Sequence, residues 1–412
     1  LLRRAMAASP SMGWAAPELF QMGFSVKDIA AAVRLTVRRV QQLVAAAGFR
    51  PAPKPVPTPA RLDKILQTEV ARHGGNYGYG FLRGALNKFH PQFRFPRARV
   101  LAALQRLYPK AADRRKQWTA QRLERGRYFA PHAGYSWHLD YACKLQDYGI
   151  YVGCIIDGCS RECVSLEVVN DKLPLTAYET VLLPALQTHG VPDQLNTDKG
   201  REWDLCAFAM LRLGQRCPHH ALRSLLGLKL RRVHRYVFSK RNTRVERFNR
   251  EINLKTLVYI KAASNELERQ GLLDKEEPVH VAAFAALASP LLQYGLDLLR
   301  SAHNHHPVPR VRCEPHSGGV PLQRAARLPH PGVGRMHVAP GFDPRGDYEQ
   351  ARGSPLRTTG SLAYHDPLAG QPLAQAHRRV LTQALCGGTA RKGWEHLVAG
   401  RLAPFVRAYV VY

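Results

Sequence analysis

Acidic residues are scarce in this chain of 412 residues. Asp and Glu number 31 against 60 Lys and Arg, which leaves a formal net charge of +29 at pH 7. Hydrophobic residues make up 45% of the chain, which excludes a wholly disordered protein. A net positive charge this large indicates the kind of partner that the protein binds rather than its fold. Nucleic acid is the commonest polyanionic partner of such proteins. A general compositional bias toward Arg is the alternative explanation. At roughly 150 residues per domain, the length predicts two or three domains.

Paired cysteines and long apolar runs are also missing. None of the eight cysteines belongs to a CxxC pair, so the spacing of a structural zinc site or a disulfide framework is absent. With no recognisable signal peptide, we expect a reducing, intracellular environment. The most apolar stretch, 279–292, is interrupted by His280, Ser289 and Pro290, and we expect it to be too short for a bilayer. We therefore expect no membrane partner and no small-molecule cofactor.

Residues 14–50 predict a small helical unit. Its apolar residues recur at helical spacing, and Thr36 is placed to cap the second of two short helices. That second helix carries Arg38 and Arg39 on its expected exposed side. The pattern resembles a helix-turn-helix with a polar recognition helix, although any small helical hairpin has a similar pattern.

Three further segments precede the change to strands. Prolines alternate through 51–60, which predicts an extended linker. Residues 61–110 predict a second small helical, DNA-binding-like unit, with a glycine-rich loop and then helices from Phe81 and over 97–108. The connector 111–133 is basic and carries interleaved aromatic residues, which favours nucleic acid over an ordinary solvated face. Its expected contacts are Arg114, Arg115 and Lys116.

From residue 134 the pattern is that of an α/β domain. Alternation over 136–142 and β-rich runs over 149–156 and 163–169 predict an antiparallel meander. A helix over 176–188, a short strand over 193–197 and helices over 203–216 and 243–262 are expected to follow. Strands first, then a strand between helices, predict a mixed sheet.

Three carboxylates stand out by position. Asp140 lies inside the first predicted strand, where a carboxylate is costly without a partner. Asp198 lies at the end of a strand, where α/β sheets place ligand groups. Glu246 is the only acid between Lys229 and Arg250, a span with nine Lys and Arg. Each has an ordinary explanation alone, as an ion pair, a turn former or a helix salt bridge. Together they form a set of hard oxygen ligands suited to Mg²⁺ or Mn²⁺.

Three motifs in this region resemble the catalytic core of retroviral-type integrases and related DDE transposases. They are Ser136–Asp140 in the first strand, Thr197–Trp203 after the fourth, and Asn242–Arg250 on a helix. Residues 156–161 resemble the turn that follows the family's second strand. The core over 134–262 and a helical tail over 263–310 are most similar to integrase-core proteins encoded in eukaryotic genomes. The retroviral His-His-Cys-Cys module is absent, and a longer second gap indicates an insertion around 212–232.

The resemblance implies both a fold and a site. The fold class is α/β, an RNase H-like mixed five-stranded sheet flanked by helices and preceded by small all-α helix-turn-helix units. Asp140, Asp198 and Glu246 would be catalytic and would hold two Mg²⁺ or Mn²⁺ ions that cut and join DNA. DNA and a homo-oligomer on DNA ends are the implied partners. The implied core contacts to phosphate are Lys199, Arg244, Arg247 and Arg250.

Alternatives stay open at this stage. A catalytically inactive, domesticated or decayed DNA-binding protein derived from a transposable element would keep the same basic surface. A nuclease acting on RNA–DNA hybrids would share the acidic site. Residues 311–412 are rich in Pro, Gly and Arg with little periodicity, so we expect a mostly irregular region with at most a short helix over 373–385. A eukaryotic source would place the protein in the nucleus, and any other source in the cytoplasm.

Overall fold

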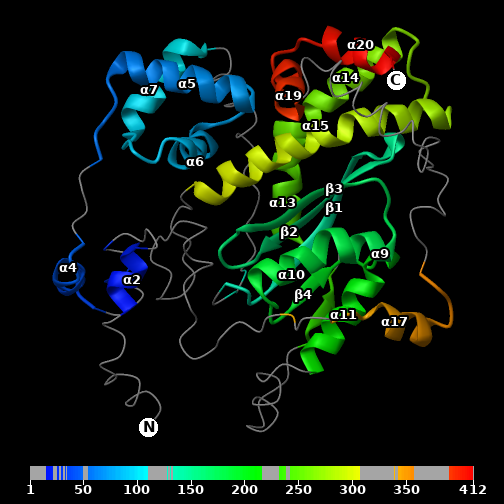
Figure 1. The fold of residues 1–412 in the computed structure, drawn as a ribbon, viewed down its shortest axis with the longest axis horizontal. Helices are drawn as coiled ribbons and strands as arrows, with labels where there is room; N and C mark the ends of the chain where they lie inside the picture. The colour runs from blue at the N-terminus through cyan, green and yellow to red at the C-terminus, as the bar shows by residue number, and fades with distance from the viewer. Residues whose placement is uncertain are drawn as a thin grey trace.

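A computed structural model describes most of the chain. The described residues are 15–21, 35–49, 54–109, 133–215, 232–237, 242–306, 342–356 and 389–411, with the single residues 26, 29, 30, 33, 128, 130 and 338. Figure 1 shows a central sheet with helices on both of its faces, small helical units from the N-terminal part of the chain, and C-terminal helices that return to the long helix α15 (Pro278–His305).

The first helical unit contains α2 (Ala15–Gln21) and α4 (Val37–Ala46), which pack together through apolar side chains such as Leu19 and Val40. The Thr36 hydroxyl accepts a hydrogen bond of 3.2 Å from the Arg39 backbone N–H, which confirms Thr36 as the cap of α4. The second unit has its own core, which includes Leu66, Leu82 and Val100. Its helices are α5 (Pro59–His73), α6 (Tyr79–Phe89) and α7 (Arg97–Leu107).

The Pro-rich linker ends earlier than the predicted range of 51–60. Pro59 is the first residue of α5, and the Thr58 hydroxyl caps this helix by accepting a 3.4 Å bond from the Arg61 N–H. Proline is tolerated at a helix start because the first backbone N–H groups have no partner within the helix. The next helix, α6, likewise begins at Tyr79 rather than at the predicted Phe81.

The central sheet has five strands in the order β3-β2-β1-β4-β5. The first three strands pair antiparallel, whereas β4 pairs parallel with both β1 and β5. This mixed sheet flanked by helices confirms the predicted RNase H-like α/β fold class. The strands are β1 (Trp137–Leu145), β2 (Ile150–Asp157), β3 (Cys163–Val169), β4 (Leu195–Thr197) and β5 (His234–Tyr236).

One face of the sheet is covered by helices that follow β3 and β4. Leu139 and Ile155 point to this face and join a buried cluster with Tyr178, Trp203 and Met210. The region 174–189, predicted as a helix over 176–188, is helical throughout but contains a π-helical segment. Its elements and the next helices are α9 (Pro174–Thr176), η3 (Ala177–Leu182), α10 (Leu183–His189), the 3-10 turn η4 (Arg201–Trp203) and α11 (Asp204–Gln215).

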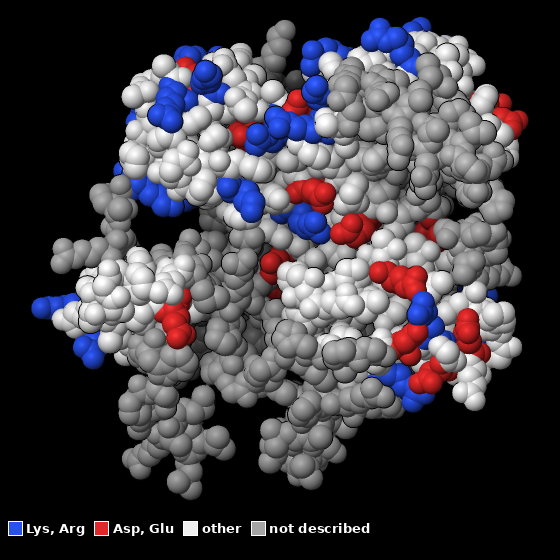
Figure 2. All heavy atoms as spheres, viewed as in Figure 1, with Lys and Arg blue, Asp and Glu red and all other residues white. Residues whose placement is uncertain are grey.

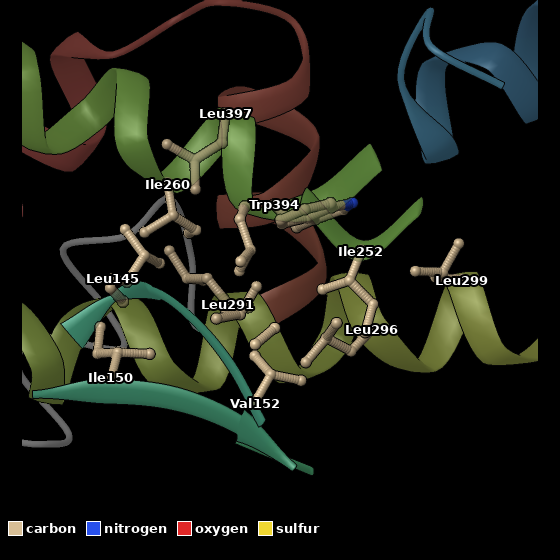
Figure 3. Packing of buried hydrophobic residues seen from close by; sticks show 14 of the residues in the cluster. Leu145, Ile150, Val152, Ile252, Ile260, Leu291, Leu296, Leu299, Trp394 and Leu397 are labelled. Atoms are coloured by element: carbon tan, nitrogen blue, oxygen red, sulfur yellow. The ribbon is translucent and has the colours of Figure 1, made fainter. Parts of the chain in front are cut away.

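The other face of the sheet is covered by the helices that follow β5. Cys154 and Ile156, which alternate with Ile155 along β2, point into a second cluster with Val245, Phe248 and Leu292. Figure 3 shows this cluster, where Leu145, Ile150 and Val152 of the sheet face side chains of the helices. The elements that continue from the predicted helix 243–262 are α13 (Thr243–Ile252), the π-helical η6 (Asn253–Leu257) and α14 (Val258–Arg269).

Helix α15 corrects the expectation of a short apolar stretch over 279–292. It has 28 residues, contains Pro290, and is long and apolar enough by composition to cross a membrane, with a mean hydropathy of 1.4 over its most apolar window. However, 56% of that window is buried inside the protein. Its inner face packs on β3 and on other helices, as expected for a helix of a protein core.

The second helical unit docks directly on α15. A Cβ added at Gly84 of α6 would lie 1.9 Å from the Ala302 carbonyl oxygen, so only glycine permits this approach of the two helices. Phe81 stacks on His306 with ring centroids 5.2 Å apart, and the Asn76 side-chain amide donates a 3.0 Å bond to the Leu254 carbonyl. These contacts join the unit to the core close to η6.

The region 311–412, predicted to be mostly irregular, contains three helices among its described residues. They are α17 (Arg345–Arg352), α19 (Ala390–Val398) and α20 (Ala403–Val411). Trp394 of α19 is 1% exposed and lies over Gly295 of α15, where an added Cβ would come within 2.4 Å of its ring. These helices leave no clear periodic pattern in the sequence, because each is only eight or nine residues long. The possible helix over 373–385 lies outside the described residues.

Candidate functional site

Two of the predicted acids meet at the centre of the sheet. The parallel register of β1 and β4 pairs Trp137 with Leu195 and His138 with Asn196. Continuing that register by two residues places Asp198, which directly follows β4, beside Asp140 of β1. Central position in a mixed sheet therefore brings together two side chains that are 58 residues apart in the sequence.

Helix α13 brings the third acid to the same place. Val245, Phe248 and Ile252 bury one face of this helix against β1 and β2. Glu246 and Asn249, three residues apart, share the neighbouring face. The Asn249 side-chain amide donates a 3.0 Å hydrogen bond to Asp140 Oδ2, which ties this face of α13 to the strand. Asn249 was not among the predicted site residues, although its spacing of three from Glu246 places it on the same side of the helix.

Electrostatics show that the three acids interact. The pKa of Asp140 is raised to about 7, mainly by burial and also by the negative charges of Asp198 and Glu246. Two groups oppose this shift: the Tyr141 backbone N–H, which donates a 2.9 Å bond to Asp140 Oδ1, and the Lys172 ammonium. Without a cation, Asp140 therefore keeps its proton to a higher pH than an ordinary aspartate does.

Asp198 is held by donors from its own loop. The Trp203 indole Nε1–H donates a 2.6 Å hydrogen bond to Asp198 Oδ1, and the Gly200 backbone N–H donates to the same oxygen at 3.1 Å. The Trp203 ring in turn stacks on Tyr141, with ring centroids 4.6 Å apart. The predicted motif Thr197–Trp203 thus has a structural basis, because its aromatic residue orients its acid.

An ion pair that the sequence did not predict flanks the acids. Lys172, in the loop after β3, lies 2.7 Å from the carboxylate of Glu202. Glu202 folds closely over the loop after β4, where a Cβ added at Gly200 would lie 2.3 Å from one of its carboxylate oxygens. No local pattern marks Lys172, because its place beside Asp140 comes from the packing of β3 against the rest of the sheet.

The turn after β2, predicted from residues 156–161, serves the fold. Asp157 is 2% exposed, and its carboxylate accepts hydrogen bonds from the backbone N–H groups of Gly134 and Ser160 at 2.7 and 2.6 Å. Arg161 takes a left-handed backbone conformation with φ of 62° at the end of this turn. The Asp157 carboxylate therefore has a structural role: its hydrogen bonds close the turn and join the turn to the chain before β1.

The acids are near one another without forming a closed ligand set. Within the described ranges, no three His, Cys, Asp or Glu side chains are grouped so that they could hold a metal ion. Like charges repel, which favours such separation of three carboxylates. The donor chemistry nevertheless fits a hard divalent cation, since the groups are carboxylate oxygens and the amide oxygen of Asn249. That amide oxygen is buried and has no hydrogen-bond partner.

The predicted basic contacts fall into three groups. Arg247 and Arg250 are exposed on α13, and Lys199 is exposed in the loop after Asp198. Arg244 is half-buried, with its guanidinium 4.2 Å from the centre of the Tyr128 ring. Arg38 and Arg39 are exposed on α4, within the separate first helical unit. The remaining predicted contacts, Arg114, Arg115 and Lys116, lie outside the described residues, as does most of the predicted insertion over 212–232.

Basic residues also cover the second helical unit. Figure 2 shows Lys and Arg side chains gathered over the region of α5, α6 and α7, and an intermixed group of acidic and basic side chains near α17. The latter group includes Arg345, which pairs with Glu179 at 2.7 Å and with Asp343 at 2.7 Å. On this face of the molecule, the basic side chains are therefore concentrated on the second helical unit, whereas near α17 they are mixed with acidic ones.

One family model matches part of this chain. Residues 128–323 match the family model described as an integrase core domain. A comparison with curated proteins gives no match. One similar solved structure is the HTLV-2 integrase catalytic core domain in complex with magnesium, in a trimeric form. The two sequences are 16% identical. The alignment covers 49% of this chain and 100% of the HTLV-2 chain, with a TM-score of 0.25.

A second similar structure is that of the simian T-cell lymphotropic virus intasome in complex with the PP2A regulatory subunit B56 gamma. The two sequences are 14% identical. The alignment covers 63% of this chain and 80% of the matched chain, with a TM-score of 0.29. The range 128–323 that matches the integrase core domain model contains the five-stranded sheet and helices α13, α14 and α15.

Proposed function

Because residues 128–323 belong to the integrase core domain family, we propose that the protein is a metal-dependent polynucleotidyl transferase that cuts and joins DNA. The observation that carries the proposal is the electrostatic effect of Asp198 and Glu246 on Asp140. Asp140 lies in β1, Asp198 directly follows β4 and Glu246 lies on α13, and all three lie near the centre of the sheet. Such a cluster costs folding energy, and a site for cations is the function that offsets this cost.

Asp140, Asp198 and Glu246 are the residues that would hold Mg²⁺ or Mn²⁺. When bound, two such ions supply an activated attacking oxygen and stabilise the oxygen that leaves the phosphodiester. The protein's own contribution is orientation. Asn249 and the Tyr141 N–H fix the carboxylate of Asp140, while Trp203 and the Gly200 N–H fix that of Asp198. Glu246 would complete the set when the acids close on the cations.

The basic side chains around the acids would hold the DNA backbone. Arg247 and Arg250 extend from the same helix as Glu246, and Lys199 follows Asp198 directly. Positive side chains on these elements would position phosphates beside the carboxylates and release counterions on binding. Arg38 and Arg39 of the first helical unit, and Arg114, Arg115 and Lys116 of the connector, are proposed as further contacts. Action on paired DNA ends would involve a homo-oligomer.

Strand transfer of a labelled DNA duplex tests the activity. We expect joining in the presence of Mg²⁺ or Mn²⁺, and its loss in the variants D140N, D198N and E246Q. The variant D147N is the matched control, because Asp147 is an exposed acid of the turn between β1 and β2. Joining that persists in D198N, or an equal loss in D147N, would contradict the assignment.

A second candidate function is DNA binding without catalysis. The observation that favours it is that the acids of the described region do not form a closed ligand set. Thermal unfolding with and without Mg²⁺ separates the two candidates. A competent site is stabilised by the cation in the wild type but not in D140N, whereas an inactive core shows no cation effect in either. Competition between duplex DNA and an RNA–DNA hybrid then tests a hybrid-specific nuclease.

A further inference from the structure

A chain of hydrogen bonds links the strand of Asp140 to the start of the helix of Glu246. The Tyr128 hydroxyl lies 2.8 Å from Ser136 Oγ and 2.7 Å from His138 Nε2. On the other side of the His138 imidazole ring, Nδ1 lies 2.6 Å from Asn242 Oδ1. The Asn242 amide then donates to the Leu139 carbonyl at 3.4 Å, directly before Asp140.

The donors and acceptors in this chain have one consistent direction. Asn242 donates through Nδ2, so its Oδ1 is an acceptor and His138 Nδ1 carries the proton. In the tautomer with the proton on Nδ1, His138 Nε2 accepts from the Tyr128 O–H. The Tyr128 oxygen in turn can accept from Ser136. Each member thereby fixes the orientation of the next, which a set of independent contacts would not do.

The surroundings show that this chain is built into the fold. His138 is 4% exposed, Asn242 1% and Ser136 3%. A Cβ added at Gly158 would lie 2.0 Å from the Tyr128 oxygen, so the space beside β1 is already taken by this hydroxyl. Asn242 precedes the first residue of α13, where an Asn side chain usually caps the helix, but its side chain makes no capping bond. Its amide serves the link to β1 instead.

We propose that His138, with Tyr128 and Asn242, is a positioning residue that sets the start of α13 against β1. Asp140 lies two residues beyond His138, and Glu246 lies four residues beyond Asn242, one turn into the helix. The link therefore controls how far the Glu246 carboxylate stands from that of Asp140. The inference deepens the proposed function and rests on it for the roles of these two acids. Asn249 of the same helix also bonds Asp140 directly, through its side-chain amide.

Hydrogen exchange of the full chain tests the link without relying on activity. In H138A, we expect amides of residues 243–250 to exchange about tenfold or more faster, because the first turn of α13 loses its anchor to β1. In H138N, an amide nitrogen near the position of Nδ1 can still donate to Asn242, so exchange returns toward the wild-type rate. Y128F, which removes the hydroxyl and keeps the ring beneath Arg244, should lie between H138A and the wild type.

Two matched controls separate positioning from general destabilisation. H189A removes a His whose ring meets Trp137 of the same strand edge-on at 6.4 Å, but which belongs to α10 on the opposite face. Y178F removes a buried hydroxyl with no hydrogen-bond partner. Neither should change exchange in 243–250 relative to 287–299 of α15. Wild-type exchange over 243–250 in H138A, or equal acceleration in both segments, would overturn the proposal.

Strand transfer provides the second readout. At saturating DNA, H138A should need a higher Mg²⁺ concentration and transfer about tenfold to a hundredfold more slowly, with DNA affinity within twofold, and H138N should recover part of the rate. If H138A proves insoluble, Y128F gives the same comparison. One outcome is that exchange is faster in H138A but the wild-type protein joins no DNA. This result would refute the proposed function, while the structural link between β1 and α13 would remain supported. Faster exchange with unchanged Mg²⁺ requirement and rate would refute the positioning role.

Discussion

The side-chain amide of Asn249 donates to the carboxylate of Asp140 at 3.0 Å and so joins helix α13 to strand β1 at the acidic cluster. The other amide atom, Oδ1, is buried without a partner. One side chain therefore orients an acid through its amide nitrogen and carries a buried, unsatisfied oxygen on the same amide group. A buried acceptor without a donor is costly, and a cation would satisfy it.

Removal of this amide should impair the proposed reaction more than the fold. We expect N249A to slow strand transfer about tenfold to a hundredfold and to raise the Mg²⁺ requirement, since residues that orient metal ligands typically contribute this much. The measurement is the transfer rate against Mg²⁺ concentration. N170A is the matched control, because Asn170 bonds the Gly149 carbonyl and Ser289 at the far end of β3. Equal rates in N249A and N170A would exclude the role.

The raised pKa of Asp140 predicts an unusual dependence of stability on pH. Its folded pKa is about 7 against an ordinary 3.8, so between these values the folded protein binds more protons than the unfolded chain. Stability from this group is complete below about pH 4 and falls as pH rises through 7, by at most about 4 kcal/mol. Without divalent cations, D140N should therefore gain stability over the wild type at pH 8 but not at pH 4. Thermal unfolding of both proteins in a chelator checks this, and an equal difference at both pH values would contradict it.

Lys172 should tune the same acid. Its ammonium lowers the pKa of Asp140, so K172Q should raise that pKa and move the acidic limb of the strand-transfer pH profile to higher pH. We expect a shift of about half a pH unit, because the Lys172 charge is partly shared with Glu202 and screened by solvent. K144Q, an exposed lysine of the same strand as Asp140, is the control. A profile that moves equally in both variants would point to net charge alone.

DNA binding should depend on the exposed arginines of α13. R247A and R250A should each weaken binding and reduce the slope of log affinity against log salt by about one, because each removes one phosphate contact. Fluorescence anisotropy with a labelled duplex over a range of NaCl concentrations measures this. R269A is the matched control, since Arg269 is exposed on α14 and bound to Glu266 at 2.6 Å. A slope unchanged in R247A and R250A would remove α13 from the DNA interface.

The C-terminal helices should prove to be part of the core fold. W394A should lower the free energy of unfolding by about 3–5 kcal/mol, because it opens a cavity between α19 and α15. W394F should cost much less, since the indole N–H that it removes is buried without a partner. Urea unfolding of the full chain measures both. A small effect of W394A would show that α19 adds little to the core on α15.

Much of the central region could be predicted from local patterns. The strands β1, β2 and β3 follow period-2 or β-rich runs, and β3 has the predicted bounds of 163–169. Strand β5 was missed as a segment, because it has only three residues and two of them are exposed. The helix over 174–189 was found, but not its π-helical turn, because such a turn depends on packing rather than on propensity.

The sequence by itself predicted most strands and helices of the core. It also predicted the three acids, the class of chemistry that they suit and their basic surroundings, because each of these is a property of short segments. Only the tertiary structure decided which distant side chains act on those acids. Asn249, Lys172 and the Tyr128–His138–Asn242 chain reach the site through a parallel strand pair and a helix packed across it. It also decided that α19 and α20 complete the core. Contacts between residues more than a hundred positions apart, such as His138 and Asn242, leave no periodic trace in a single sequence, because they are set by how whole elements pack.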